Sequence, residues 1–103
     1  MKKSRGKKLL QGRKFDSEKL RWDLLPFDCL NEIIRVLMHG ANKYSDYGWQ
    51  TVPNAKQRYF SALIRHVSAW WQGEKKDPES GLSHLAHAGC CLLFLMWFDR
   101  KEK

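Results

Sequence analysis

Residues 77–95 read DPESGLSHLAHAGCCLLFL, and this stretch decides the fold that we expect. Turn-forming residues open it, and an apolar run follows in which His84 and His87 are spaced i and i+3. Asp77 and the proline after it have the residue types of a helix N-cap and of a first helical position, so they predict a helix that runs to Phe98. On this helix the two imidazoles share a face, where they need polar partners from the rest of the chain.

Two further helices are predicted upstream. Apolar residues recur at intervals of three and four from Phe27 to Tyr44, which is typical of an amphipathic helix. A second pattern of this kind spans residues 55–71 and ends at Gly73, a residue type that often follows a helix. Residues 42–54 are rich in turn formers and predict a loop, whose aromatic residues either cover a ligand or plug the end of the helix pair. Residues 14–26 have no clear period and predict an extended lead-in.

Three helices without an alternating strand pattern predict an all-α fold. The last helix is apolar on nearly every side between Leu92 and Phe98, which is more than a three-helix monomer can cover. We therefore expect a helical bundle completed by homo-oligomerisation, as a dimer or a larger assembly. We divide the chain into a basic flexible leader over residues 1–13 and a single all-α domain over residues 14–103.

Positive charge is concentrated at the N-terminus. The formal net charge is +8, and residues 1–14 hold seven basic residues and no acid. We expect this segment to be a flexible arm with weak, non-specific affinity for nucleic acid. Three cysteines do not form a disulfide framework, and no apolar run approaches the roughly 20 residues of a membrane-spanning helix. A cytoplasmic protein without membrane contact is the expectation.

Acidic residues of the first predicted helix could complete a site with the two imidazoles. Asp28 and Glu32 are i and i+4, so an antiparallel packing of the first and last helices would set two carboxylates opposite His84 and His87. Such a set can bind a metal ion or a phosphate. The alternatives are solvated acids on one helix and hydrogen-bonded core histidines on the other.

Other groups near this predicted site have two interpretations each. A zinc site of His84, His87 and Cys91 has suitable ligand types, but two helical turns separate its outer members. We favour Cys90 and Cys91 as small buried residues. The candidates for binding phosphate oxygens, each of which could instead be an ordinary surface charge, are Lys43, Arg58, Arg65 and His66.

Several separated blocks of the sequence resemble a known family. They are Lys14-Phe15-Asp16, Asp23-Leu24-Leu25-Pro26, Gly40-Ala41-Asn42-Lys43-Tyr44 with Trp49, Arg65-His66, Trp70-Trp71-Gln72-Gly73-Glu74, Asp77-Pro78-Glu79-Ser80-Gly81-Leu82 and His84-Leu85-Ala86-His87-Ala88. In this order they resemble the phage dATP/dGTP diphosphohydrolase N-terminal domain family, over about residues 14–98. That family is similar to the MazG-like all-α nucleoside triphosphate pyrophosphohydrolases, which work as dimers or larger assemblies.

The resemblance implies a metal-dependent pyrophosphohydrolase in the cytoplasm of an infected host cell. It would convert a purine deoxynucleoside triphosphate to the monophosphate and pyrophosphate. On this interpretation Glu32 is the catalytic residue. The metal ligands would be Asp28, Glu32, His84 and His87. The phosphates would be bound by Lys43, Arg65 and His66, and the base would stack on Tyr44 or Trp49.

The sequence departs from the signature of the wider family, which is two acids three apart on one helix and a Glu and an Asp three apart on another. Asp28 and Asn31 occupy the first pair, and His84 and His87 occupy the second. Histidines favour Mn²⁺, Co²⁺ or Zn²⁺ over Mg²⁺, or else no metal at all. Without a metal, the same pocket would sequester a nucleotide or a nucleotide signal without turnover, as a counter-defence sponge. A third interpretation is a nucleic-acid-associated factor that acts through the basic leader.

Overall fold

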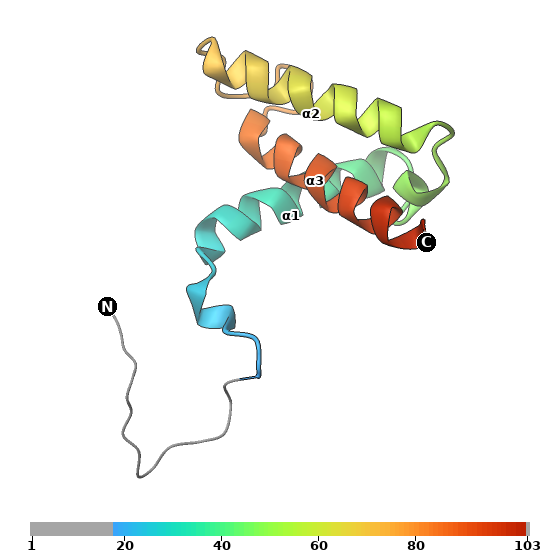
Figure 1. The fold of residues 1–103 in the computed structure, drawn as a ribbon. Coiled ribbons are helices and arrows are strands. Elements are labelled where there is room, and N and C mark those ends of the chain that lie inside the picture. Colours follow the sequence, from blue (N-terminus) through green and yellow to red (C-terminus); the bar gives the residue numbers. More distant parts are fainter. Residues whose placement is uncertain (1–17, 103) are drawn as a thin grey trace.

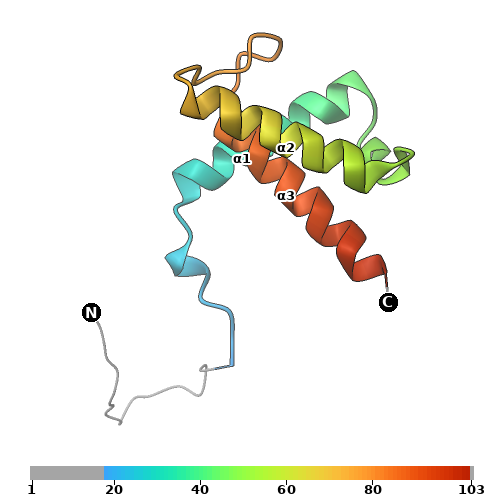
Figure 2. The ribbon, with the colours of Figure 1, turned by 45° about the horizontal axis from the view of Figure 1, so that its top comes forward.

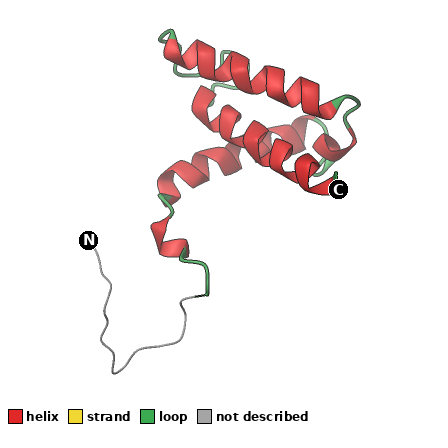
Figure 3. Ribbon diagram, viewed as in Figure 1, coloured by secondary structure: helices red, strands yellow, loops and turns green. Residues whose placement is uncertain are grey.

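Three helices make up the domain in the computed structural model, which describes residues 18–102. They are α1 (Phe27–Lys43), α2 (Ala55–Trp71) and α3 (His84–Lys101), with short 3-10 helices η1 (Trp22–Leu24) and η2 (Gly48–Thr51). Residues 18–102 contain no strand, as Figure 3 shows. The all-α prediction is confirmed, while the predicted leader lies outside the described residues. Over the same range, no helix has the length and apolar character that crossing a membrane requires.

Helices α2 and α3 lie side by side and run antiparallel (Figure 1). The ring of His66, in the second half of α2, lies 5.1 Å from the ring of His84 at the start of α3. Tyr59, near the start of α2, lies 4.9 Å from Phe94 in the second half of α3. This pairing brings the residues after α2 and the first turn of α3 to the same end of the molecule.

Helix α1 crosses α3 at a glycine. A Cβ atom at Gly89 would lie only 2.6 Å from Cδ1 of Ile33, so the absence of a side chain permits the close approach of α1. Beside this crossing the Cys90 thiol donates a hydrogen bond to the Ile33 carbonyl oxygen, at 3.4 Å. The core around the crossing is small. Its buried members are Val36, Ala86 and Cys90, against which Ile33, Leu37, Leu82 and Phe94 pack.

The end of α2 follows the sequence prediction. Gly73 has a φ of 109°, in the left-handed region that glycine adopts readily. Its N–H donates to the Trp70 carbonyl at 3.0 Å, and the Glu74 N–H donates to the Ala69 carbonyl at 3.0 Å. These two bonds form a Schellman motif, which satisfies the last carbonyls of the helix and turns Glu74 back toward the start of α3.

The predicted start of α3 at Asp77 is wrong, because the helix begins at His84. The Asp77 carboxylate accepts the backbone N–H of Ser80 at 2.9 Å and so closes a turn instead of capping a helix. Gly81 then has a φ of 73°, which a helix cannot pass through. Ser83 is the true N-cap, since its hydroxyl accepts the Ala86 N–H at 3.2 Å. Residues 72–83 therefore form a loop that connects α2 to α3 and projects away from the two helices (Figure 2).

The loop between α1 and α2 packs through one of its aromatic residues. The Trp49 ring stacks on Phe94 with ring centroids 4.4 Å apart, and its edge meets Trp97 at 5.1 Å. Its carbonyl accepts a hydrogen bond from the Tyr59 hydroxyl at 3.1 Å. Trp49 thus plugs the end of the α2–α3 pair. Tyr44, by contrast, is 74% exposed.

Candidate functional site: a polar groove beside a histidine cluster

A groove of about 1080 Å³ lies between the second half of α1, the aromatic loop, α2 and the turn at residues 77–80. It is lined by every residue that the sequence predicted to bind the substrate, namely Lys43, Tyr44, Trp49, Arg65 and His66. His87 of α3 also lines it. Residues far apart in the sequence are thus brought to one concave surface.

The groove carries two arginines that are available to an anion. Arg58 and Arg65 both come from α2 and line the groove. Among residues 18–102, no carboxylate lies within ion-pair distance of either guanidinium. Lys43 differs, because its ammonium pairs with the Glu79 carboxylate and so ties α1 to the 77–80 turn. The hydrogen bond between the two raises the pKa of Lys43 and lowers the pKa of Glu79.

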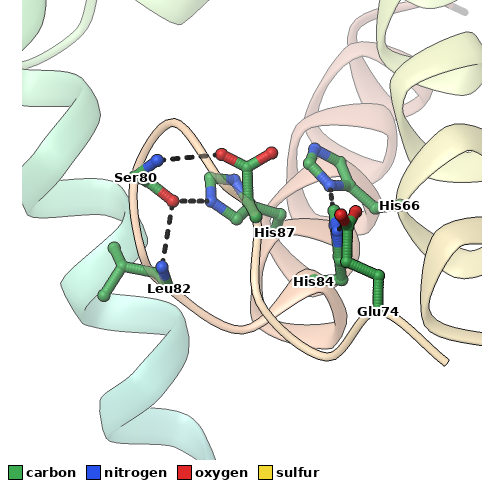
Figure 4. A network of polar contacts seen from close by, with 7 residues as sticks. His66, Glu74, Ser80, Leu82, His84 and His87 are labelled. Atoms are coloured by element: carbon green, nitrogen blue, oxygen red, sulfur yellow. Dashed lines mark hydrogen bonds and ion pairs between the residues drawn. The ribbon is translucent and has the colours of Figure 1, made fainter.

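A chain of hydrogen bonds joins two histidines to a carboxylate (Figure 4). Nδ1 of His66 lies 2.8 Å from Nδ1 of His84, and Nε2 of His84 lies 2.7 Å from Oε1 of Glu74. His84 is only 4% exposed. An ionised carboxylate only accepts hydrogen bonds, so Glu74 favours the proton on Nε2 of His84 and leaves a lone pair on Nδ1 facing His66.

His87 belongs to the cluster but is held differently. Its ring stacks on His66 with centroids 4.5 Å apart and planes 10° apart. Its Nε2 lies 2.7 Å from the Ser80 hydroxyl, whose oxygen also accepts the Leu82 N–H at 3.1 Å. The tautomer of His87 sets the direction of this bond, because the hydroxyl can donate to Nε2 or accept from it (Figure 4). This bond turns Nε2 of His87 toward the loop, while the flat of its ring supports His66.

Burial controls the protonation of the cluster. It lowers the pKa of His66 to about 4, helped by the neighbouring His87 and His84, and it also lowers the pKa of His87. Burial, the largest single influence, would raise the pKa of Asp77, but the hydrogen bonds from Ser80 together with the neighbouring His87 and His66 lower it, and the net shift is downward. At neutral pH the ring of His66 is uncharged beside an ionised Asp77. These are the protonation states that a bound cation requires.

Three residues of the cluster could hold a metal ion. His66, Asp77 and His84 each offer a ligand atom, and these atoms all lie within 4.8 Å of one another. They come from α2, from the 77–80 turn and from α3. The sequence had singled out His84 as a ligand and His66 as a phosphate contact. Asp77 was missed because it was interpreted as a helix cap, although the Asp-Pro-Glu-Ser-Gly run is also typical of a turn. Glu74 belonged to one of the blocks that resemble the family, but no role was predicted for it from the sequence.

Asp28 and Glu32 lie elsewhere on α1. Both are exposed and neither lines the groove. No metal-compatible group found within residues 18–102 includes them. Glu32 does lie on the same line of α1 as His39 and Lys43, at i+7 and i+11, and those two residues line the groove. The roles predicted for Asp28 and Glu32 stay predictions.

The adjacent cysteines are buried, as the sequence predicted. Cys90 is 2% exposed and Cys91 is 6% exposed. Burial raises the pKa of Cys90 to about 12 and the pKa of Cys91 to about 11. Both thiols therefore stay protonated at neutral pH, which leaves neither of them ready to attack or to bind a metal.

Fold and site together define a small all-α domain with an arginine-lined groove next to a metal-compatible histidine cluster. The chain belongs to the family described as dATP/dGTP diphosphohydrolase, N-terminal, whose model matches residues 10–103. It is similar to a protein named dATP/dGTP diphosphohydrolase from Salmonella phage PMBT28, with 35% identity over 88 residues. The alignment covers 85% of this chain but 30% of the phage protein, so the chain spans less than a third of that relative. No solved structure matches it significantly.

Proposed function

We propose that this chain is a nucleotide-binding domain whose groove takes a purine deoxynucleoside triphosphate and hydrolyses it to the monophosphate and pyrophosphate. One observation carries the proposal, which is that Arg58 and Arg65 face an open groove without a carboxylate partner among residues 18–102. Guanidinium forks without such a partner suit phosphate oxygens. Family membership supplies the choice of a purine deoxynucleotide.

The parts of the nucleotide have natural places along the groove. Arg58 and Arg65 would bind the triphosphate. Tyr44, exposed at the groove margin, would stack on the base, because the Trp49 ring already packs against Phe94. A divalent metal held at the histidine cluster would polarise the phosphoryl oxygens and activate the water consumed when the α–β phosphoanhydride breaks. Lys43 would meet the phosphates after parting from Glu79.

A direct test incubates the full chain with each of the four deoxynucleoside triphosphates and with Mg²⁺, Mn²⁺, Co²⁺ or Zn²⁺, and measures pyrophosphate and monophosphate. Arg65→Ala should weaken triphosphate binding by about 10- to 100-fold, because hydrogen bonds to charged groups contribute roughly 1.5–3 kcal/mol. Arg35→Ala is the matched control, since Arg35 is exposed on α1 and does not line the groove. Equal affinities of the two variants would refute the assignment of the groove.

The second candidate function is a nucleotide-sequestering protein that uses the same groove without turnover. The observation that favours it is that the metal-compatible group contains one carboxylate, from Asp77, and two imidazoles, from His66 and His84. Tight binding of a nucleotide that is recovered unchanged, with every metal tried, would establish this function in place of hydrolysis. A third candidate, a nucleic-acid role through residues 1–14, predicts that deletion of these residues removes all function.

We propose that a second copy of this chain covers the exposed apolar surface. The apolar face consists of Phe60, Ile64, Trp71, Leu85, Leu92 and Met96, each at least 45% exposed. Of the residues described, the buried hydrophobic ones are only Val36, Ala55, Ala86, Ala88, Cys90 and Cys91, which are mostly small. A second copy would supply the missing burial.

Light scattering tests this proposal and should give a mass above that of one chain. The double variant Ile64→Lys with Leu92→Lys should have a lower mass than the native chain. An unchanged mass would contradict the proposal.

A further inference from the structure

We propose that His66, Asp77 and His84 bind one divalent transition metal ion, with Glu74 holding His84 in the ligating tautomer. The inference names the metal site that the proposed function requires, and it rests on that function only for the role of the ion in hydrolysis. The binding itself is a separate property, which can be measured without any nucleotide.

The two imidazole nitrogens are already placed as ligands of one ion. Nδ1 of His66 and Nδ1 of His84 lie 2.8 Å apart. Zinc–nitrogen bonds of about 2.0–2.1 Å at a tetrahedral angle set two ligand nitrogens roughly 3.3 Å apart. The two Nδ1 atoms therefore need to move apart by only about half an ångström to become ligands of one ion. A change of this size is within reach of side-chain rotation. The proton on Nδ1 of His66 would first move to Nε2 of the same ring.

Asp77 supplies the third ligand with one of its oxygens already fixed. Oδ2 accepts the Ser80 N–H at 2.9 Å, which orients the carboxylate, and a carboxylate oxygen lies within 4.8 Å of the imidazole ligand atoms. The backbone of the turn is also held, because the Asp77 N–H donates to the Leu82 carbonyl at 2.8 Å. The ligand is thus placed by backbone geometry and not by a mobile side chain alone.

Glu74 is the outer-shell partner that histidine ligands commonly have. Its carboxylate lies 2.7 Å from Nε2 of His84, which fixes the orientation of the ring and favours the tautomer with a lone pair on Nδ1. The Schellman motif that ends α2 sets the position of Glu74. A ligand pair without this support could rotate freely, whereas His84 is buried and tied at its far nitrogen.

The donor set indicates the kind of ion. Two imidazole nitrogens and one carboxylate oxygen suit Zn²⁺, Co²⁺ or Fe²⁺, whereas Mg²⁺ prefers a shell of oxygens. Three protein ligands would leave at least one coordination position for water or for a phosphate oxygen. Since His66 and Asp77 line the groove, that position would open toward the nucleotide.

The test uses the full chain without a polyhistidine tag, titrated with Co²⁺ alone and with Zn²⁺ alone. Visible absorption of Co²⁺ and calorimetry of Zn²⁺ should each give one ion per chain, and Mg²⁺ should not displace either. His66→Gln and Asp77→Asn should each abolish stoichiometric binding, and the asparagine can still accept the Ser80 N–H. Glu74→Gln should weaken affinity by about 10- to 100-fold. His39→Gln is the matched control, because His39 lines the groove outside the set.

Circular dichroism of each variant separates a lost ligand from a lost fold. The proposal is overturned if the native chain binds neither ion, if the folded His66→Gln and Asp77→Asn chains bind as the native chain does, or if His39→Gln loses as much affinity as they do. Failure of the metal site would leave nucleotide binding at Arg58 and Arg65 intact. Failure of the proposed function would appear as the reverse, with one Co²⁺ bound and no affinity for any triphosphate.

Discussion

Adding a methyl group at Gly89 tests the crossing of α1 and α3, which brings the second half of α1 to the groove. The new Cβ atom would lie 2.6 Å from Cδ1 and 3.0 Å from Cγ1 of Ile33, whereas ordinary contacts begin near 3.4 Å. Gly40 offers a matched control, because a Cβ atom there meets nothing within 4 Å although the residue also lies inside a helix. The pair of variants separates steric crowding from helix propensity.

The expected magnitudes follow from these distances. Replacing a helical glycine by alanine stabilises by about 0.8–1.0 kcal/mol, and Gly40→Ala should show this gain in full. Gly89→Ala has the same gain, but crowding Ile33 in a packed site costs about 1–3 kcal/mol. The free energy of unfolding of Gly89→Ala should therefore lie about 1–3 kcal/mol below that of Gly40→Ala.

Urea denaturation followed by circular dichroism measures both variants, and a double-mutant cycle identifies the contact. Ile33→Val removes the crowded Cδ1 atom, so it should cost about 0.5–1.5 kcal/mol in the native background and much less beside Gly89→Ala. If Gly89→Ala is stabilised as much as Gly40→Ala, or if Ile33→Val costs the same in both backgrounds, the two helices do not cross at this point.

Three further predictions concern the cap, the thiols and the base contact. Ser83→Ala should lower the free energy of unfolding by about 1 kcal/mol, because the Ala86 N–H loses its acceptor, and Ser83→Asp should restore it in the same urea assay. The pKa of the Cys90 thiol is about 12 in the folded chain and 9.0 when the thiol is exposed, as in the unfolded chain. The stability contributed by the buried, protonated thiol is therefore fully present below pH 9 and falls by about 1.4 kcal/mol per pH unit as the pH rises from 9 toward 12. Equal urea midpoints at pH 8 and pH 10 would refute this. Tyr44→Ala should weaken nucleotide affinity in calorimetry by about tenfold or more through loss of stacking, whereas Tyr47→Ala, an exposed tyrosine outside the groove, should not, and equal losses would count against the base site.

The sequence was most informative where hydrophobic periodicity and terminal residues agreed. Residues 55–71 form α2 as predicted, because the apolar spacing and Gly73 mark the same boundary. At Asp77 the two kinds of signal conflicted. An aspartate followed by proline suits a helix start and also a turn, and the turn prevails because Ser80 and Gly81 complete it.

The candidate site was predicted in its residue types more than in its geometry. Lys43, Arg65 and His66 line one groove, as expected of residues chosen for phosphate binding. The partnership of His66 with His84 depends on the register between α2 and α3, which local patterns do not encode. Glu74 reaches His84 only because of the turn after α2, so no spacing rule could have paired them.

The groove and the apolar face occupy different sides of the α2–α3 pair. On α2, Arg58 and Arg65 lie on one side of the helix and line the groove, whereas Phe60 and Ile64 lie about 200° and 240° round the helix from Arg58 and are exposed. Evolution could therefore alter the ligand chosen by one surface while conserving the other, and laboratory redesign could do the same. Libraries confined to groove positions would explore new chemistry on an unaltered scaffold.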